Sequence, residues 1–115
     1  MKVLVVDDEE HLVEALGDVL IKKGFTVDTA YDGLEALEKL KEKSFDFMIM
    51  DLKMPRMGGE ELMKITKEKY PRTEIIIITG YGTIKNAITA TKNGAWDYLV
   101  KPFSSKELLL SMSKT

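Results

Sequence analysis

The chain has 115 residues, of which 44% are hydrophobic and 31% are charged, and its formal net charge is −2. These values are typical of one globular domain with a single core, and they give no basic surface for direct contact with nucleic acid. The chain contains no cysteine, which excludes disulfides and thiolate chemistry and fits a reducing compartment. No apolar stretch reaches the roughly 20 residues of a membrane helix, and the first apolar run is too short for a signal peptide.

The first half of the chain predicts two strand–helix units. An apolar run over residues 2–6 is followed by an amphipathic helical pattern over residues 9–23. A second run, over residues 25–29, leads to Asp32, which resembles a capping box together with Glu35 three residues later. The helix expected there carries leucines at a helical spacing, namely Leu34, Leu37 and Leu40.

The second half predicts three further units of the same kind. Four consecutive isoleucines, at positions 75–78, are apolar on both faces, as in a parallel strand covered by helices on both sides. A capping-box pair, Ser104 and Glu107, begins the last and shortest helix. The expected strands cover residues 45–50, 74–79 and 96–100, and the expected helices before the last cover residues 58–69 and 83–93, with Thr83 as a cap.

Strand and helix therefore alternate five times along the chain. This alternation predicts an α/β fold with a doubly wound parallel sheet and right-handed crossovers. We expect one domain over residues 1–115.

Chemically active side chains stand where four of these strands end. Asp7 and Asp8 follow the first strand, Asp51 the third, Thr79 ends the fourth, and Lys101 follows the fifth. In open α/β sheets, ligands bind outside the carboxyl ends of the strands. If the first and third strands are neighbours, these side chains converge at one edge of the sheet.

The three carboxylates and the lysine suggest a combined metal and phosphate site. One divalent cation together with Lys101 would neutralise Asp7, Asp8 and Asp51. Hard oxygen ligands on an open edge suit Mg²⁺ that is completed by water and a phosphate oxygen. A carboxylate can also attack phosphorus as a nucleophile, which would give an aspartyl phosphate at Asp51.

Each of these residues also has an ordinary structural interpretation. Asp7 and Asp8 can stabilise the start of the following helix. Thr79 alone is a strand residue, Lys101 alone is a solvated lysine, and Tyr98 alone packs on the sheet. Only the combination of Asp7, Asp8, Asp51 and Lys101 favours a functional site.

Four segments resemble the receiver domain of two-component response regulators. They are Val-Val-Asp-Asp-Glu at residues 5–9, Met-Asp-Leu-Lys-Met-Pro-Arg-Met-Gly-Gly at 50–59, Thr-Gly at 79–80 and Lys-Pro-Phe at 101–103. In this order they cover essentially the whole chain. The resemblance implies a flavodoxin-like (βα)5 fold with strand order 2-1-3-4-5. Residues 79–103 look most like receivers of nitrogen-regulation-type transcriptional activators, which implies transcription regulation.

The resemblance also implies a ligand set for Mg²⁺. Asp51 is expected to be the phosphoacceptor and, with Asp8, a direct metal ligand. The backbone carbonyl of Lys53 is expected to be the third protein ligand, and Asp7 is expected to act through bound water.

Three further residues are assigned to the switch by the resemblance. The Thr79 hydroxyl and the Lys101 ammonium are expected to contact the phosphoryl group, and the Tyr98 ring is expected to turn inward on activation. The Lys101–Pro102 peptide bond is expected to be cis. The face formed by the helix at 83–93, the strand at 96–100 and the last helix would then change shape.

The function implied is a signalling switch in the cytoplasm. A histidine kinase would donate the phosphoryl group, and the switch would act on an effector domain or a downstream protein. A homodimer through the face just described is a further expectation. The sequence ends at Thr115, and both a single-domain regulator and a fragment of a larger protein are compatible with it; the short last helix leads us to expect a fragment or a trimmed chain.

Two other functions compete with the switch. An aspartyl-phosphate phosphohydrolase commonly carries a second acid two residues after its nucleophile, whereas this chain has Lys53 there. A non-phosphorylated interaction module would be expected to have lost its acidic site. In this chain Asp7, Asp8 and Asp51 are all present. Lys53 and Tyr81, two residues after Asp51 and Thr79, are bulky and predict slow loss of the phosphoryl group.

Overall fold

The computed structural model describes residues 1–54, 56–80 and 84–113, and it describes residues 84–87 by their backbone alone. Thr83, expected to cap a helix, lies outside these residues, as does Tyr81. Within them, no helix has both the length and the apolar composition to cross a membrane. The elements in chain order are β1 (Lys2–Val6), α1 (Glu10–Lys22), β2 (Thr26–Ala30), α2 (Gly33–Glu42), β3 (Phe47–Asp51), α3 (Gly59–Lys69), β4 (Glu74–Thr79), α4 (Ile84–Lys92), β5 (Asp97–Val100) and α5 (Ser105–Met112).

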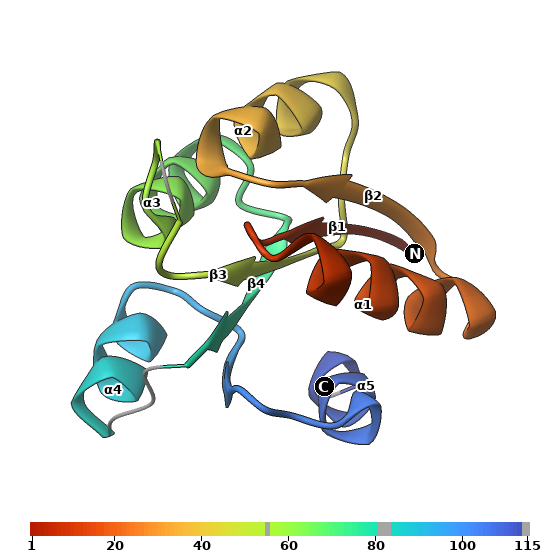
Figure 1. Cartoon of the computed structure of the whole chain (residues 1–115). Helices are drawn as coiled ribbons and strands as arrows, with labels where there is room; N and C mark the ends of the chain where they lie inside the picture. The colour runs from red at the N-terminus through yellow and green to blue at the C-terminus, as the bar shows by residue number, and fades with distance from the viewer. Residues whose placement is uncertain (55, 81–83, 114–115) are drawn as a thin grey trace.

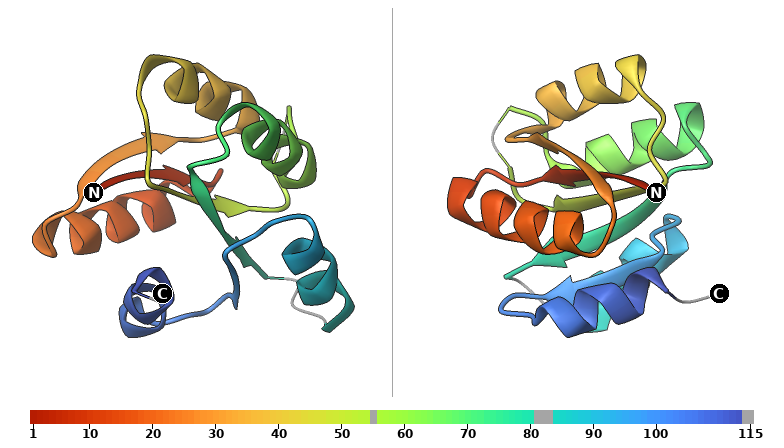
Figure 2. Two further views of the ribbon diagram at one scale, coloured as in Figure 1. Left: turned by 180° about the vertical axis from the view of Figure 1, so that it is seen from behind. Right: turned by 90° about the vertical axis from the view of Figure 1, so that its right-hand side faces the viewer.

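The strands form one five-stranded parallel sheet in the order β2-β1-β3-β4-β5. Figures 1 and 2 show α2 and α3 together on one side of this sheet and α1 and α5 on the other. Since β1 and β3 are direct neighbours, with Val6 beside Met50 in the register, the residues that follow them emerge side by side. The predicted fold and strand order are confirmed.

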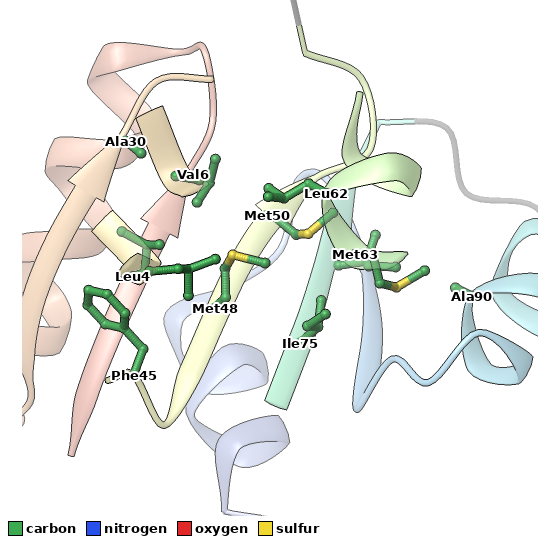
Figure 3. Close-up of a cluster of buried hydrophobic side chains, with 13 residues drawn as sticks. Leu4, Val6, Ala30, Phe45, Met48, Met50, Leu62, Met63, Ile75 and Ala90 are labelled. Carbon is green, nitrogen blue, oxygen red and sulfur yellow. The ribbon is translucent and has the colours of Figure 1, made fainter. Parts of the chain in front are cut away.

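A separate apolar core lies on each face of the sheet. The first core joins the sheet to α2, α3 and Ala90 of α4, and Figure 3 shows it around Met48 and Met50. The second core joins the sheet to α1 and α5. Ile75 and Ile77 enter the first core while Ile76 and Ile78 enter the second, and all four are fully buried. The isoleucine run is therefore covered on both faces, as predicted.

The boundaries of three strands differ from the sequence prediction. β2 begins and ends one residue later than expected, and β5 begins after Trp96. β3 begins at Phe47 rather than at residue 45, and its last residue is Asp51. Asp46 accepts a hydrogen bond from the Glu74 backbone N–H at 2.9 Å, so it continues the pairing of the strands without belonging to β3.

The predicted helix caps are largely confirmed. Ser104 and Glu107 form both bonds of a capping box. The Asp32 carboxylate accepts from the Glu35 N–H at 2.8 Å, but the Glu35 side chain accepts from the Tyr31 N–H at 3.4 Å instead of from Asp32. Leu34, expected among the apolar positions of α2, is 42% exposed because the small residues Gly33 and Ala36 face the core there.

Candidate functional site

Three acidic side chains converge at the carboxyl ends of the two central strands. Asp7 follows β1, Asp8 comes next, and Asp51 is the last residue of β3. One carboxylate oxygen from each lies within 4.8 Å of the others. Asp7 is fully buried and Asp51 is 7% exposed, whereas Asp8 is exposed. Two of the three acids, Asp7 and Asp51, are therefore buried, and Asp8 is open to solvent.

The backbone orients two of these carboxylates. Asp7 Oδ1 accepts a hydrogen bond from the Glu9 N–H at 3.0 Å, and Asp51 Oδ1 accepts one from the Lys53 N–H at 3.1 Å. Both are bonds to an amide two residues later, in the manner of an Asx turn. Each strand therefore continues into a turn that fixes its own acid.

Lys101 connects the acids to β5. Its Nζ donates to Asp7 Oδ2 at 2.8 Å, to Asp51 Oδ2 at 2.9 Å and to Glu9 Oε1 at 3.1 Å. Burial disfavours the charged ammonium, but the hydrogen bonds to the three carboxylates outweigh that effect, so the pKa of Lys101 is raised above its ordinary value. Lys101 is therefore a fixed positive charge in contact with Asp51.

Glu9 is a contact residue that the sequence prediction of the site did not include. Its side chain is 63% exposed, yet it reaches the Lys101 ammonium. Glu9 belongs to the acidic run that begins at Asp7, but it lies three residues beyond β1, so the sequence does not indicate that it reaches Lys101. Glu9 is thus the third carboxylate on Lys101 and, with Asp8, the fourth acid near the site, which increases the negative charge that a cation would meet.

The start of α3 presses against the strand end that carries Asp51. The Gly59 N–H donates to the Leu52 carbonyl at 2.8 Å. A Cβ at position 59 would lie 2.5 Å from the Asp51 carbonyl oxygen and 2.6 Å from Leu52 Cα. Only glycine fits such a close approach of two backbones. This contact fixes the course of the chain just after Asp51.

Thr79, at the end of β4, lies beside the acids in the sheet. It is 1% exposed, and its carbonyl accepts from the Lys101 N–H at 2.7 Å. It also borders a cavity of about 260 Å³, together with Lys53 of the loop after β3. The residues at the ends of β3 and β4 therefore border one cavity, and a backbone hydrogen bond links the end of β4 to Lys101 after β5.

Tyr98 and the peptide bond after Lys101 complete the predicted set. Tyr98 lies in β5 and packs, half-buried, against the core on the α2–α3 side. The Lys101–Pro102 bond is cis, as expected. The roles assigned to these residues remain predictions.

The donor set fits a hard divalent cation. The three aspartates offer anionic oxygens only, and they do so where the backbone already fixes two of them. Such ligands at an open edge suit Mg²⁺ with several waters retained. The excess of carboxylates over the one lysine provides the electrostatic attraction.

Comparison with known proteins places this arrangement in a family. The family model of the response regulator receiver domain matches residues 3–113. The transcriptional regulatory protein ZraR of Klebsiella oxytoca is 39% identical over 112 residues, which are 97% of this chain and 25% of that protein. A putative NtrX-like response regulator of Rickettsia bellii is 37% identical over 97% of this chain and 24% of its own length. The chain thus spans about a quarter of the length of these relatives.

Solved structures agree with the family model. A response regulator receiver domain protein from Clostridium thermocellum has a TM-score of 0.89 and 36% identity, with 96% of this chain and 90% of that one covered. The beryllofluoride-activated NtrC4 receiver domain dimer has a TM-score of 0.90 and 40% identity, with 96% and 92% covered. The likeness to nitrogen-regulation-type activators is confirmed by these relatives. The chain belongs to the response regulator receiver domain family.

Proposed function

We propose that the chain is a phosphorylation-controlled switch whose phosphoacceptor is Asp51. One observation carries the proposal: the Asp51 carboxylate ends a central strand, lies among two further acids and is held 2.9 Å from the Lys101 ammonium. Receiver domains are signalling modules, which agrees with a switch rather than an enzyme that turns over a substrate. The exposed Lys53 in place of a second acid argues in the same direction.

The metal in this proposal is Mg²⁺. Asp8 and Asp51 would bind it directly, the Lys53 carbonyl would be a third ligand, and Asp7 would act through water. When bound, the ion supplies positive charge next to the transferred phosphoryl oxygens. The clustered carboxylate oxygens of Asp7, Asp8 and Asp51 support this assignment.

The covalent step is a transfer between two side chains. An Asp51 carboxylate oxygen attacks the phosphorus of a kinase phosphohistidine, and a P–O bond forms as the P–N bond breaks. The electron pair of the broken bond stays on the imidazole nitrogen. Phosphoryl transfer depends mainly on alignment and charge, and Lys101 supplies a fixed cation at the acceptor.

The signal would leave the site through β4 and β5. The Thr79 hydroxyl would turn to the new phosphoryl group, and Tyr98 would move inward behind it. Thr79 ends β4 and Tyr98 lies opposite Ile77 in the neighbouring β5, and the Thr79 carbonyl already accepts from the Lys101 N–H. The face formed by α4, β5 and α5 would change as a result.

The partners in this proposal are a histidine kinase and an effector. Because relatives such as ZraR are named as transcriptional regulators and are about four times as long, an effector domain or downstream protein in transcription is the proposed target. A homodimer is proposed through the α4–β5–α5 face, defined here by the exposed side chains Ile88, Val100 and Leu110. The cytoplasm is the proposed location.

The proposal is tested with a small phosphodonor such as acetyl phosphate. With Mg²⁺ present, the protein should gain one phosphoryl group in a linkage that is stable to acid and labile to base. Asp51→Asn should gain none, while Asp46→Asn, which changes an exposed acid just before the opposite end of β3, should react normally. Equal labelling of Asp51→Asn would overturn the proposal.

The lifetime of the phosphoryl group is a separate prediction. Lys53 borders the cavity next to Thr79, so its side chain would obstruct a water molecule that approaches Asp51 in line. Lys53→Ala should therefore speed dephosphorylation about two- to tenfold at unchanged Mg²⁺ affinity. The decay of isolated phosphoprotein measures this, with Lys64→Ala on the exposed side of α3 as the control. An unchanged rate in Lys53→Ala would show that this side chain does not obstruct water.

A further inference from the structure

Arg56, in the loop between β3 and α3, has an unusual backbone conformation. Its φ is +69°, in the left-handed region. Only glycine, and to a lesser extent asparagine and aspartate, adopts this region without a substantial cost. An arginine in this region is held there by its side chain or by its neighbours.

The side chain of Arg56 forms a salt bridge with Asp32, the residue that caps the start of α2. Its Nε lies 3.1 Å from Asp32 Oδ2, and its Nη2 lies 3.4 Å from Asp32 Oδ1. The Asp32 side chain is only 13% exposed, and its Oδ1 also caps the Glu35 N–H at 2.8 Å. The guanidinium therefore pairs through two atoms with a carboxylate that the helix already immobilises.

The next residue strengthens the same attachment. A Cβ at Gly33, the first residue of α2, would lie 2.7 Å from Met57 Cβ and 2.9 Å from the Met57 carbonyl oxygen. Arg56 and Met57 thus fasten one part of the loop to α2. At its other parts, the Lys53 N–H donates to Asp51 Oδ1, and the Gly59 N–H donates to the Leu52 carbonyl.

We propose that Arg56 is a positioning residue for the metal site. Its pairing with Asp32 would hold the loop in the conformation in which the Lys53 carbonyl serves as the third ligand of the cation that Asp8 and Asp51 bind. This inference rests on the proposed function, because it takes Mg²⁺ as the ligand of the acidic cluster. It adds a contact between two segments 24 residues apart in the chain that neither binds the metal nor touches the phosphoryl group.

The direction in which Mg²⁺ affinity changes when Arg56 is replaced distinguishes a positioning role from a purely electrostatic one. Arg56 carries a positive charge at the end of the sheet where the cation binds. By Coulomb's law alone, its removal should make the site bind a cation more tightly. If Arg56 positions the loop, its removal should instead weaken binding, because one ligand is no longer pre-organised.

The experiment measures Mg²⁺ dissociation constants by isothermal titration calorimetry. Arg56→Gln should raise the Mg²⁺ Kd about three- to tenfold. Arg72→Gln removes the same charge from an exposed arginine at the opposite end of the sheet, and it should leave the Kd unchanged. The thermal unfolding midpoint of Arg56→Gln should stay close to that of the wild type, because the arginine is 61% exposed.

A double-mutant cycle tests the pair itself. Asp32→Asn keeps a capping side chain on α2 but removes the charge that Arg56 grips. The combination of Arg56→Gln and Asp32→Asn should raise the Kd no further than Arg56→Gln alone. Independent contributions would give multiplied Kd changes and would overturn the pairing.

Two outcomes separate this inference from the proposed function. A Kd for Arg56→Gln that is unchanged or lower would overturn the positioning role and leave the proposed function intact. A wild-type chain that binds no Mg²⁺ would overturn both.

Discussion

At the scale of single residues, Lys101 pairs with acidic side chains that would otherwise repel one another. Its ammonium contacts Asp7, Asp51 and Glu9, and its own side chain is 16% exposed. In the metal-free protein this single lysine offsets much of the repulsion among the acids. The same contacts place it where a phosphoryl group on Asp51 would need a cation.

Replacement of Lys101 should destabilise the metal-free protein. Lys101→Gln leaves Asp7 and Asp51 without their cation, so the free energy of unfolding should fall by about 1–3 kcal/mol, less than for a fully buried pair. Urea unfolding without metal measures this change. Added Mg²⁺ should recover more stability in Lys101→Gln than in the wild type, since it binds only the folded site.

A matched control uses another lysine of the same region. Lys106 is exposed on α5, and Lys106→Gln should change the free energy of unfolding by less than about 0.5 kcal/mol. Equal losses in Lys101→Gln and Lys106→Gln would mean that the contacts of Lys101 with the acids contribute nothing to stability.

At the scale of elements, the site depends on how helices meet the ends of strands. α3 begins against the last residue of β3, and α2 begins next to the loop that connects them. On the edge of the sheet, β2 is tied to α2 by Asp28, which accepts hydrogen bonds from Lys39 and Lys43 at 3.1 Å each. These contacts fix where each helix lies relative to the neighbouring strand.

The close contact between β3 and the start of α3 can be tested by adding one methyl group at Gly59. Gly59→Ala places a Cβ against the Asp51 carbonyl oxygen and Leu52 Cα, both of which are backbone atoms and cannot turn away. The variant should lose about 1–3 kcal/mol of stability, and its Mg²⁺ affinity should fall because the Asp51 segment shifts. Gly58→Ala, where the nearest atom would be 3.9 Å away, is the control. Normal Mg²⁺ affinity in Gly59→Ala would contradict this description of the junction.

The junction of β2 and α2 should depend on pH. Burial would raise the pKa of Asp28, but hydrogen bonds from the Thr29 backbone N–H and from Lys39 and Lys43 outweigh it, so the pKa is lowered below 3.8. Because the unfolded state takes up the proton first, the stabilisation is fully present above that value and is lost as the pH falls through the folded pKa.

Asp28→Asn tests this dependence. At neutral pH the variant should be less stable than the wild type by about 1 kcal/mol, and the difference should shrink in acid below about pH 4. Urea unfolding at a series of pH values gives the comparison, with Asp18→Asn on the exposed side of α1 as the control. A difference that is the same at neutral and acid pH would argue against a charge effect.

The elements were largely predictable because their signals are local. Apolar runs and helix caps lie within a few residues of one another, and they placed the strands to within one or two residues. Leu34 was misassigned because it shares the helical spacing of Leu37 and Leu40, which do pack in the core, whereas the close packing of Met57 on Gly33 occupies the buried side at the start of α2. That contact joins distant segments, so no local pattern could indicate it.

The site residues at strand ends were predictable from the sequence, whereas the exposed charged residues around them were not. Asp51 ends β3, and Asp7 and Lys101 directly follow β1 and β5, so the topology places all three at the same edge of the sheet. Glu9 and Arg56 are exposed charged residues in turns, and their partners are set by tertiary geometry. Exposed charges carry no periodic signal, and their contacts appear only in the structure.

At the scale of the whole molecule, the proposed partner surface is the α4–β5–α5 face defined above. One apolar side chain from each element is exposed there: Ile88 by 52%, Val100 by 45% and Leu110 by 58%. The relative NtrC4 was solved as an activated receiver domain dimer. In the proposed function, phosphorylation at Asp51 reshapes this face and promotes self-association.

Phosphorylation should therefore raise the sedimentation coefficient of the wild type at micromolar concentration. Leu110→Glu places a charge on the α4–β5–α5 face and should keep the phosphorylated chain monomeric. Leu34→Glu changes an exposed leucine on α2, away from that face, and should leave the association unchanged. If Leu110→Glu associates as the wild type does, the proposed interface is wrong.

The central claim is that the phosphoryl group is carried by Asp51, with Asp7 and Asp8 as its metal-binding neighbours. Borohydride reduction after treatment with Mg²⁺ and acetyl phosphate converts an aspartyl phosphate to homoserine, which peptide mass spectrometry can place in the sequence. We expect homoserine at position 51 and aspartate retained at positions 7 and 8. Homoserine at position 7 or 8, or a protein left unlabelled under these conditions, would contradict it.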